Sequence, residues 1–204
     1  MAEGEYVQLP GGWTAWRRPP GDPPGPPVLL IHGLTGDERS MAVFAGAFPP
    51  GSLLLAPRAS HVFEGGGYSW TESVGWPAWE DLAPSAEALA GLIAAVDPGP
   101  WLVAGFSQGA AVALALAARG EPLAGVAALA GFLPEGDLPA GAWTGLRVFW
   151  GHGTLDEQVP IERARQGARA LRQAGARLDL CETEVDHRLG AACLRALKAW
   201  AASD

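Results

Sequence analysis

The chain has 204 residues, of which 49% are hydrophobic and 18% are charged, a balance typical of a folded globular protein rather than a disordered one. Its 14 basic and 22 acidic side chains give a net charge of −8, and the arginines between Arg163 and Arg177 are spaced as on a solvated helix. A nucleic-acid partner is therefore not expected, because no cluster of basic side chains is available to neutralise phosphates. We expect a single domain over residues 1–204.

Two cysteines, Cys181 and Cys193, occur without a C-x-x-C pair, which argues against a disulfide framework and a zinc site. This pattern favours the reducing cytoplasm, although the two thiols could pair if the fold brought them together. The segment from Met1 to Leu9 lacks the basic and apolar regions of a secretory signal. The apolar stretch from Trp101 to Ala118 is interrupted by glycines, a serine and a glutamine, so we expect a buried strand and helix there and no stable membrane insertion.

The first half of the chain predicts strands followed by a long helix. Residues 5–18 predict one or two edge strands, and the proline-rich residues 19–27 form a loop into the core. Val28–Ile31 and Leu53–Ala56 are short apolar runs of strand length. Residues 79–96 carry apolar side chains at helical spacing, and the predicted helix stops before the Asp97-Pro98-Gly99-Pro100 turn.

The second half continues the alternation of strands and helices. Strands are predicted over Trp101–Phe106, Gly125–Leu133, Leu146–Trp150 and Leu178–Glu184, and helices over Gln108–Arg119, 160–174 and 190–202. The first two of these strands are continuous apolar runs, typical of strands buried on both faces, whereas the last alternates as a half-buried edge strand does. The sequence therefore predicts an α/β fold with a mostly parallel sheet, helices on both faces, and ligands beyond the carboxyl ends of the strands.

The most informative motif is G-x-S-x-G, formed by residues 105–109 between a predicted strand and a predicted helix. In this setting the chain turns abruptly, and the small residues around Ser107 let the strand and the helix approach each other. The turn presents the serine hydroxyl at the tip of the sheet. We interpret Ser107 as a catalytic nucleophile; the alternative is a tight glycine turn without chemistry.

A serine hydroxyl needs a base, and the chain has four histidines. His187 lies in the loop between the last strand and the last helix, after Ser107 in the order that this fold uses for its triad, so it is the predicted base. His32 precedes the serine, His61 lies in a glycine-rich loop that could touch substrate, and His152 is expected to hydrogen-bond within a turn.

The acid that orients His187 should follow a strand between the serine and the histidine. Asp156 meets this condition, since it follows the strand that ends at Trp150 through a turn-rich segment. Asp137 is the competitor after the preceding strand. Asp186 is adjacent to the histidine, a position from which a carboxylate seldom makes the required contact.

Acyl transfer also needs donors for the developing oxyanion. The backbone N–H of Gln108, directly after the nucleophile, is the first predicted donor. The second is the backbone N–H of Leu34, in the loop His32-Gly33-Leu34-Thr35-Gly36 after the first core strand.

With these motifs the chain resembles the phospholipase/carboxylesterase family of small α/β-hydrolases, which includes the acyl-protein thioesterases. The matching features are His32-Gly33-Leu34, Gly105-Phe106-Ser107-Gln108-Gly109, Gly151-His152-Gly153-Thr154-Leu155-Asp156 with Val159-Pro160, Asp186-His187, and the substrate-side segment Pro57-Arg58 with residues 65–70. The resemblance covers about residue 28 to the end. The family usually has glycine where this chain has Ala110 and Asp186, two positions that do no chemistry but indicate a divergent member.

The resemblance implies an α/β-hydrolase fold, and Ser107 and Asp156 are only 49 positions apart, which leaves no room for a large lid. An open site favours soluble esters with short-to-medium acyl chains. The residues predicted to line the substrate pocket are Trp70, Trp76, Phe132 and Leu133, and Trp79 clusters with the first two. For the tryptophans, packing in the protein interior is the alternative.

We therefore expect a serine carboxylesterase with a small-molecule ester substrate and an acyl-enzyme intermediate. An acyl thioesterase or lysophospholipase with the same triad, and a non-catalytic small-ligand sensor on the same fold, are the alternatives. No metal-ligand spacing such as H-E-x-x-H occurs, so no cofactor or metal is expected. A homodimer is left open.

Overall fold

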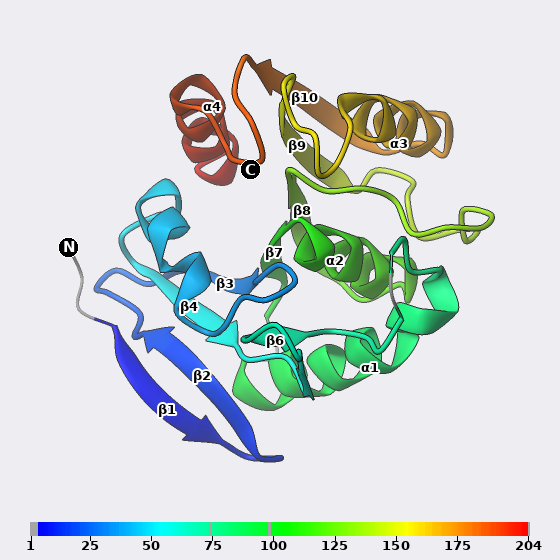
Figure 1. Cartoon of the computed structure of the whole chain (residues 1–204). Coiled ribbons are helices and arrows are strands. Elements are labelled where there is room, and N and C mark those ends of the chain that lie inside the picture. The colour runs from blue at the N-terminus through cyan, green and yellow to red at the C-terminus, as the bar shows by residue number, and fades with distance from the viewer. Residues whose placement is uncertain (1–3, 74, 98, 204) are drawn as a thin grey trace.

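The computed structural model describes residues 4–73, 75–97 and 99–203, and eight of the strands in that part of the chain form one sheet in the order β1-β2-β4-β3-β7-β8-β9-β10 (Figure 1). Their bounds are β1 Glu5–Leu9, β2 Trp13–Arg18, β3 Gly25–Ile31, β4 Ser52–Pro57, β7 Trp101–Phe106, β8 Leu123–Leu129, β9 Arg147–Gly153 and β10 Arg177–Thr183. Strands β1 and β2 pair antiparallel, as do β2 and β4, and the other neighbouring pairs are parallel. The predicted mostly parallel sheet is confirmed, with β10 at one edge.

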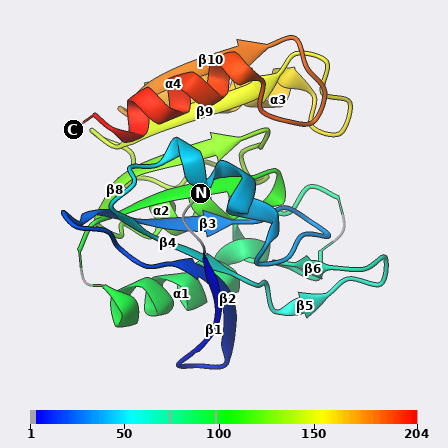
Figure 2. The ribbon, with the colours of Figure 1, turned by 90° about the vertical axis from the view of Figure 1, so that its left-hand side faces the viewer.

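Helices cover both faces of the sheet. Helices α1 (Trp79–Val96), α2 (Gln108–Ala118) and α3 (Ile161–Gln173) pack on one face, and the short 3₁₀ helix η1 (Ser40–Ala47) and α4 (Ala191–Ala201) pack on the other. Figure 2 looks onto the second face, with η1 and α4 in front of the strands. This arrangement is the predicted α/β-hydrolase fold.

The central strands read as continuous apolar runs because both of their faces are covered. In β3, Leu29 and Ile31 point into the core beneath α1 and α2, whereas Val28 and Leu30 point into the core beneath η1 and α4, and all four side chains are fully buried. Alternate residues of a strand face opposite sides, so a strand between two helical layers has to be apolar at every position.

Several predicted boundaries differ from the structure. Strand β3 begins at Gly25, inside the predicted proline-rich loop, and β8 ends at Leu129 rather than at residue 133, because Ala130 adopts a positive φ of 46° and takes the chain out of the sheet. Strand β9 continues through Gly153. Neither η1 nor the two-stranded sheet of β5 (His61–Val62) and β6 (Tyr68–Ser69) was predicted. The helix that precedes the Asp97–Pro100 turn ends at Val96 as predicted, but Pro98 lies outside the described residues.

Most of the predicted site residues lie at the carboxyl ends of the parallel strands. The carboxyl ends of β3, β7, β9 and β10 lead directly into the segments that contain Leu34, Ser107, Asp156 and His187. Neighbouring parallel strands end on the same side, so these segments, far apart in sequence, meet there.

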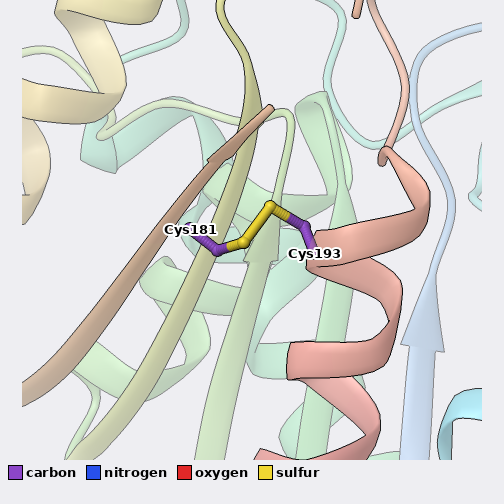
Figure 3. Close-up of a disulfide and its surroundings, with 2 residues drawn as sticks. All are labelled: Cys181 and Cys193. Atoms are coloured by element: carbon purple, nitrogen blue, oxygen red, sulfur yellow. A yellow bond between two sulfur atoms is a disulfide. The ribbon is translucent and has the colours of Figure 1, made fainter. Parts of the chain in front are cut away.

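Cys181 and Cys193 form a disulfide that links β10 to the beginning of α4 (Figure 3). Of the two outcomes that the sequence left open, the fold therefore brings the thiols together. Disulfides persist mainly in oxidising compartments. Because the two cysteines are paired, they do not support the cytoplasmic location that the sequence analysis favoured. Among the helices in the described ranges, none combines the length and the hydropathy that crossing a bilayer would require.

Candidate active site

Ser107 lies between β7 and α2 with φ 54° and ψ −119°, a backbone conformation that residues other than glycine rarely adopt. The glycines on either side make this turn feasible. A Cβ atom on Gly105 would clash with the backbone of Gly109, and a Cβ atom on Gly109 would clash with the carbonyl oxygen of Ile31. The structure thus gives the G-x-S-x-G motif the abrupt strand-to-helix turn that the sequence predicted.

His187 and Asp156 are in direct contact: Nδ1 of His187 lies 2.7 Å from Oδ2 of Asp156. The Asp156 side chain is fully buried, and its other oxygen accepts hydrogen bonds from the backbone N–H groups of Gln158 (3.0 Å) and Val159 (2.8 Å). One carboxylate oxygen is therefore fixed by the backbone, which leaves the second aimed at the imidazole. The competitor Asp137 has an exposed side chain.

His152 is a second histidine beside the same carboxylate. Its ring is fully buried, its Nε2 lies 2.8 Å from the carbonyl oxygen of Val159, and the same nitrogen lies 3.4 Å from Oδ2 of Asp156. Burial lowers the pKa of His152 below its ordinary value, so the ring is held neutral. His152 therefore lies in β9 rather than in the predicted turn, and its hydrogen bond reaches the segment between β9 and α3.

The loop after β3 passes directly against the serine. A Cβ atom on Gly33 would lie 3.2 Å from Cβ of Ser107, so only a glycine allows this close approach without displacement. Thr35 has a positive φ of 65°, and its N–H donates to the carbonyl oxygen of Tyr68 at 3.0 Å. The loop is therefore held between the serine turn and β6.

The side chain of Gln108 is buried. Its Oε1 accepts a hydrogen bond from the backbone N–H of Trp70 at 3.1 Å, and its Nε2 donates to Oγ of Ser69 at 3.1 Å. The amide thereby fastens the segment after β6 to the start of α2. Only the backbone N–H of Gln108, at the first position of the helix, remains for the predicted oxyanion role.

Ser107 and His187 both line a cavity of about 960 Å³. Most of its walls are apolar. They come from the loop after β3, from η1, from the segment between β6 and α1, from the serine turn and from the segment after β8. The other walls are formed by the segment between β9 and α3, by the loop between β10 and α4, and by α4 itself. The lining residues are Gly33, Leu34, Thr35, Gly36, Ser40, Met41, Val43, Phe44, Gly75, Trp76, Phe106, Ser107, Gln108, Phe132, Gln158, Val159, His187, Arg188, Leu189 and Leu194.

Two of the four predicted pocket residues line this cavity. Trp76 is 36% exposed, and its ring meets that of Phe132 edge-on, with centroids 4.7 Å apart. Trp70 and Leu133 do not line the cavity, so their assignment to it is corrected. The Trp70 side chain is buried beneath the loop after β3 and donates from Nε1 to the carbonyl oxygen of His32 at 2.8 Å, whereas Leu133 packs toward Gly167 of α3.

The other aromatic and histidine candidates lie outside the cavity. Trp79 is buried and packs against Trp143, with centroids 6.1 Å apart. His61 lies 3.5 Å from the exposed carboxylate of Glu72.

Sequence reasoning missed the wall formed by η1 and the His187 loop. The segment from Ser40 to Ala47 contributes Met41, Val43 and Phe44, and the other side contributes Leu189 and Leu194. The signal was present, since apolar side chains in a segment directly after a predicted oxyanion loop have to be covered or face a ligand. Val43 is 75% exposed and lines the cavity, so this part of η1 is not covered by the core.

The two departures from the family pattern have simple surroundings. Ala110 is fully buried, and its methyl group occupies the space that a Cβ atom of Gly131 would need. The family usually has a glycine at position 110; in this chain the contacting residue Gly131 is the glycine, which leaves room for the methyl group of Ala110. The Asp186 carboxylate is 68% exposed and pairs with Arg188 at 2.7 Å, away from the Asp156 contact.

Comparisons with known proteins agree with this architecture. The family model that matches, described as phospholipase/carboxylesterase, covers residues 18–202. The chain is 28% identical to a probable inactive carboxylesterase of rice (Oryza sativa subsp. japonica) over 190 aligned positions, which span 80% of this chain and 76% of the rice protein.

Two solved structures are similar in fold at low sequence identity. A carboxylesterase from Mesorhizobium loti matches with a TM-score of 0.83 and 19% identity, over 98% of this chain and 99% of that one. The Bacillus cereus carboxylesterase matches with a TM-score of 0.82 and 21% identity, over 98% of this chain and 94% of that one. Because the family model spans nearly the whole chain, the resemblance seen in its motifs is confirmed: the chain belongs to the phospholipase/carboxylesterase family and is a serine hydrolase by that membership.

Proposed function

We propose that the chain is an active serine carboxylesterase that hydrolyses short-to-medium acyl esters with Ser107 as nucleophile, His187 as base and Asp156 as orienting acid. The observation that carries the proposal is the 2.7 Å contact between His187 Nδ1 and Asp156 Oδ2, because His187 lines the cavity that also contains Ser107. A carboxylate on Nδ1 leaves Nε2 of the imidazole free to take the serine proton.

In the proposed reaction, Ser107 Oγ attacks the ester carbonyl carbon while His187 accepts the hydroxyl proton. The carbonyl electron pair moves onto its oxygen, and the backbone N–H groups of Leu34 and Gln108 donate to that oxyanion. Collapse of the intermediate expels the alcohol, to which His187 returns the proton. Water then attacks the acyl-enzyme with His187 as base, which releases the carboxylic acid and restores the serine.

The walls of the cavity support an uncharged, largely apolar substrate. Its volume of about 960 Å³ is at the upper end of the range of ligand pockets, about 300–1,000 Å³. Arg188 is the only Lys, Arg, Asp or Glu among the described lining residues, and it already pairs with Asp186. A small-molecule ester with apolar groups fits this chemistry better than an ionic substrate.

Hydrolysis of p-nitrophenyl esters from acetate to palmitate tests the proposal, with Ser107→Ala and the matched control Ser60→Ala. Ser60 is an exposed serine that does not line the cavity. We expect turnover with an optimum at short-to-medium chains, a loss of at least about 1,000-fold in Ser107→Ala, and unchanged kcat in the control. Circular dichroism of each variant shows that the loss is not unfolding.

The same assay distinguishes the alternatives. Faster cleavage of butyryl thioesters than of butyryl esters, with the same dependence on Ser107, would make the chain a thioesterase. No turnover of any ester or thioester, together with a rise in Tm on adding an ester, would replace the proposal by a non-catalytic sensor, and would accord with the name of the rice relative.

A further inference from the structure

His32 is fully buried at the end of β3, and both of its ring nitrogens have partners. Nε2 lies 3.1 Å from the backbone N–H of Ala59, and Nδ1 lies 2.7 Å from the carbonyl oxygen of Gly33. Its ring also stacks at a tilt on Trp70, with centroids 5.1 Å apart. The side chain is thus fixed at the start of the loop that carries Leu34.

The two partners determine the protonation of the ring. A backbone N–H can only donate, so Nε2 must be the unprotonated nitrogen that accepts from Ala59. Nδ1 then carries the proton and donates to Gly33. A doubly protonated ring would place one N–H against another at Ala59, and burial lowers the pKa of His32 in the direction that keeps the ring neutral.

The bond to Gly33 sets the direction of the next peptide N–H. The Gly33 carbonyl oxygen accepts from Nδ1 of His32 at 2.7 Å and from the backbone N–H of Gly36 at 3.0 Å. This carbonyl belongs to the same peptide unit as the N–H of Leu34, and in a planar trans peptide the two point in opposite directions. Two donors on one side of the peptide therefore direct the Leu34 N–H to the other side.

The two N–H groups that follow Leu34 in the loop are engaged in hydrogen bonds. Thr35 donates to Tyr68 and Gly36 donates to Gly33, whereas no acceptor contacts the Leu34 N–H within the described part of the chain. Gly33 lies directly against Ser107, and Leu34 lines the cavity. The Leu34 N–H is thus a donor beside the serine that no described acceptor engages.

We infer that His32 is a positioning residue for the oxyanion hole: its Nδ1–H fixes the Gly33 carbonyl and so aims the Leu34 N–H at the oxygen of the tetrahedral intermediate. The inference rests on the proposed esterase function. His32 itself touches no substrate; it acts through one peptide plane. Its side chain is not among the residues that line the cavity.

Two substitutions separate this role from simple packing. In His32→Asn the side-chain amide reaches the position of Nδ1, so it can donate to Gly33 but loses the bond from Ala59. In His32→Gln the amide reaches the position of Nε2, so it can accept from Ala59 but loses the bond to Gly33. Each variant loses one buried hydrogen bond, and we expect similar decreases in Tm.

We expect kcat of His32→Gln to fall about 10- to 100-fold with KM changed less than about threefold, and kcat of His32→Asn to stay within about threefold of wild type. The affinity for a trifluoromethyl ketone, which forms an oxyanion on Ser107, should fall in parallel with kcat in His32→Gln. Equal kcat in the two folded variants would overturn the inference. Absence of turnover in the wild-type protein would instead refute the proposed function.

A measurement on the wild-type protein keeps the inference testable if either variant fails to fold. The ring ¹⁵N chemical shifts of histidine distinguish the two neutral tautomers without any assay of turnover. We expect His32 in the Nδ1–H form and His152, whose Nε2 faces the carbonyl of Val159, in the Nε2–H form at pH 7.5. An Nε2–H tautomer at His32 would exclude the bond to Gly33 and with it the inference.

Discussion

Oδ2 of Asp156 lies 2.7 Å from Nδ1 of His187, although 31 residues separate them in the chain. Helix α3 and strand β10 lie between the two residues. Asp156 follows the carboxyl end of β9 and His187 follows the carboxyl end of β10. The contact is therefore a product of the parallel β9–β10 pairing.

Replacement of Asp156 by Asn should abolish most activity while the fold is retained. The amide oxygen can still accept from Gln158 and Val159, but the amide N–H₂ would face Nδ1 of His187 and favour the wrong tautomer. We expect kcat with p-nitrophenyl butyrate to fall by about 10³- to 10⁴-fold. Asp137→Asn, at the exposed competitor position, is the control and should retain wild-type kcat; a comparable loss there would reopen the assignment of the acid.

The disulfide should make a measurable contribution to stability. It closes a loop with a sequence separation of 12 residues that contains His187, and Cys193 is fully buried. A loop of this size is worth about 3 kcal/mol, so Cys181→Ala/Cys193→Ala should lower Tm by about 5–10 °C in calorimetry.

A dithiol reductant supplies an independent test of the disulfide. It should lower Tm of the wild-type protein in the same direction and leave the double variant unaffected. If the reductant had no effect on wild type although mass spectrometry showed free thiols, the stabilising role of the disulfide would be excluded.

Trp76 should limit the length of the acyl or alcohol group. Its ring lies edge-on to Phe132, and the guanidinium of Arg163 sits 3.8 Å from its centroid, which holds the indole at the cavity wall. Trp76→Ala removes this wall, so we expect kcat/KM for butyrate to fall about tenfold and the chain-length optimum to move to longer esters. Val62→Ala, an apolar truncation at a 78% exposed site away from the cavity, should leave the profile unchanged. An unaltered optimum in Trp76→Ala would place the substrate elsewhere in the cavity.

The free energy of unfolding should decrease as the pH falls from 7.5 to 5.5. Burial lowers the pKa of both His32 and His152 in the folded protein, whereas in the unfolded chain a histidine has a pKa of about 6.5. Below that pH the unfolded state binds protons that the folded state excludes, so stability is fully present above about pH 7 and is lost on acidification. Each histidine contributes a slope of at most about 1.4 kcal/mol per pH unit.

Urea unfolding at several pH values between 7.5 and 5.5 measures this slope. His152→Gln removes one of the two titrating rings while its amide can still donate to the Val159 carbonyl, so the slope should fall to about half. A slope that is the same in wild type and in His152→Gln would show that His152 does not titrate in the predicted way.

Local motifs could be read from the sequence because their structure depends on near neighbours. The strand-to-helix turn at Ser107 follows from the two glycines and from the apolar segments on each side, and the unbroken apolar runs identify strands that are covered on both faces. Even there the exit from β8 was misplaced by four residues, because the positive φ of Ala130 has no signature in the side chain.

The choice between two candidate acids illustrates the limit of such reasoning. Both Asp137 and Asp156 follow a strand, and spacing alone left the choice open. Tertiary structure distinguishes them, since the backbone N–H groups of Gln158 and Val159 bury and orient one carboxylate while the other faces solvent.

The sequence by itself determined the α/β fold, the family, the serine turn and the order of the predicted triad, because each rests on hydrophobic periodicity or on backbone sterics within a few residues. Only the tertiary structure decided that Cys181 and Cys193 pair, that Trp70 supports the loop after β3 instead of lining the cavity, and that η1 forms a wall. These features depend on how segments distant in sequence lie against one another, and the type of a residue does not indicate which distant residues will contact it.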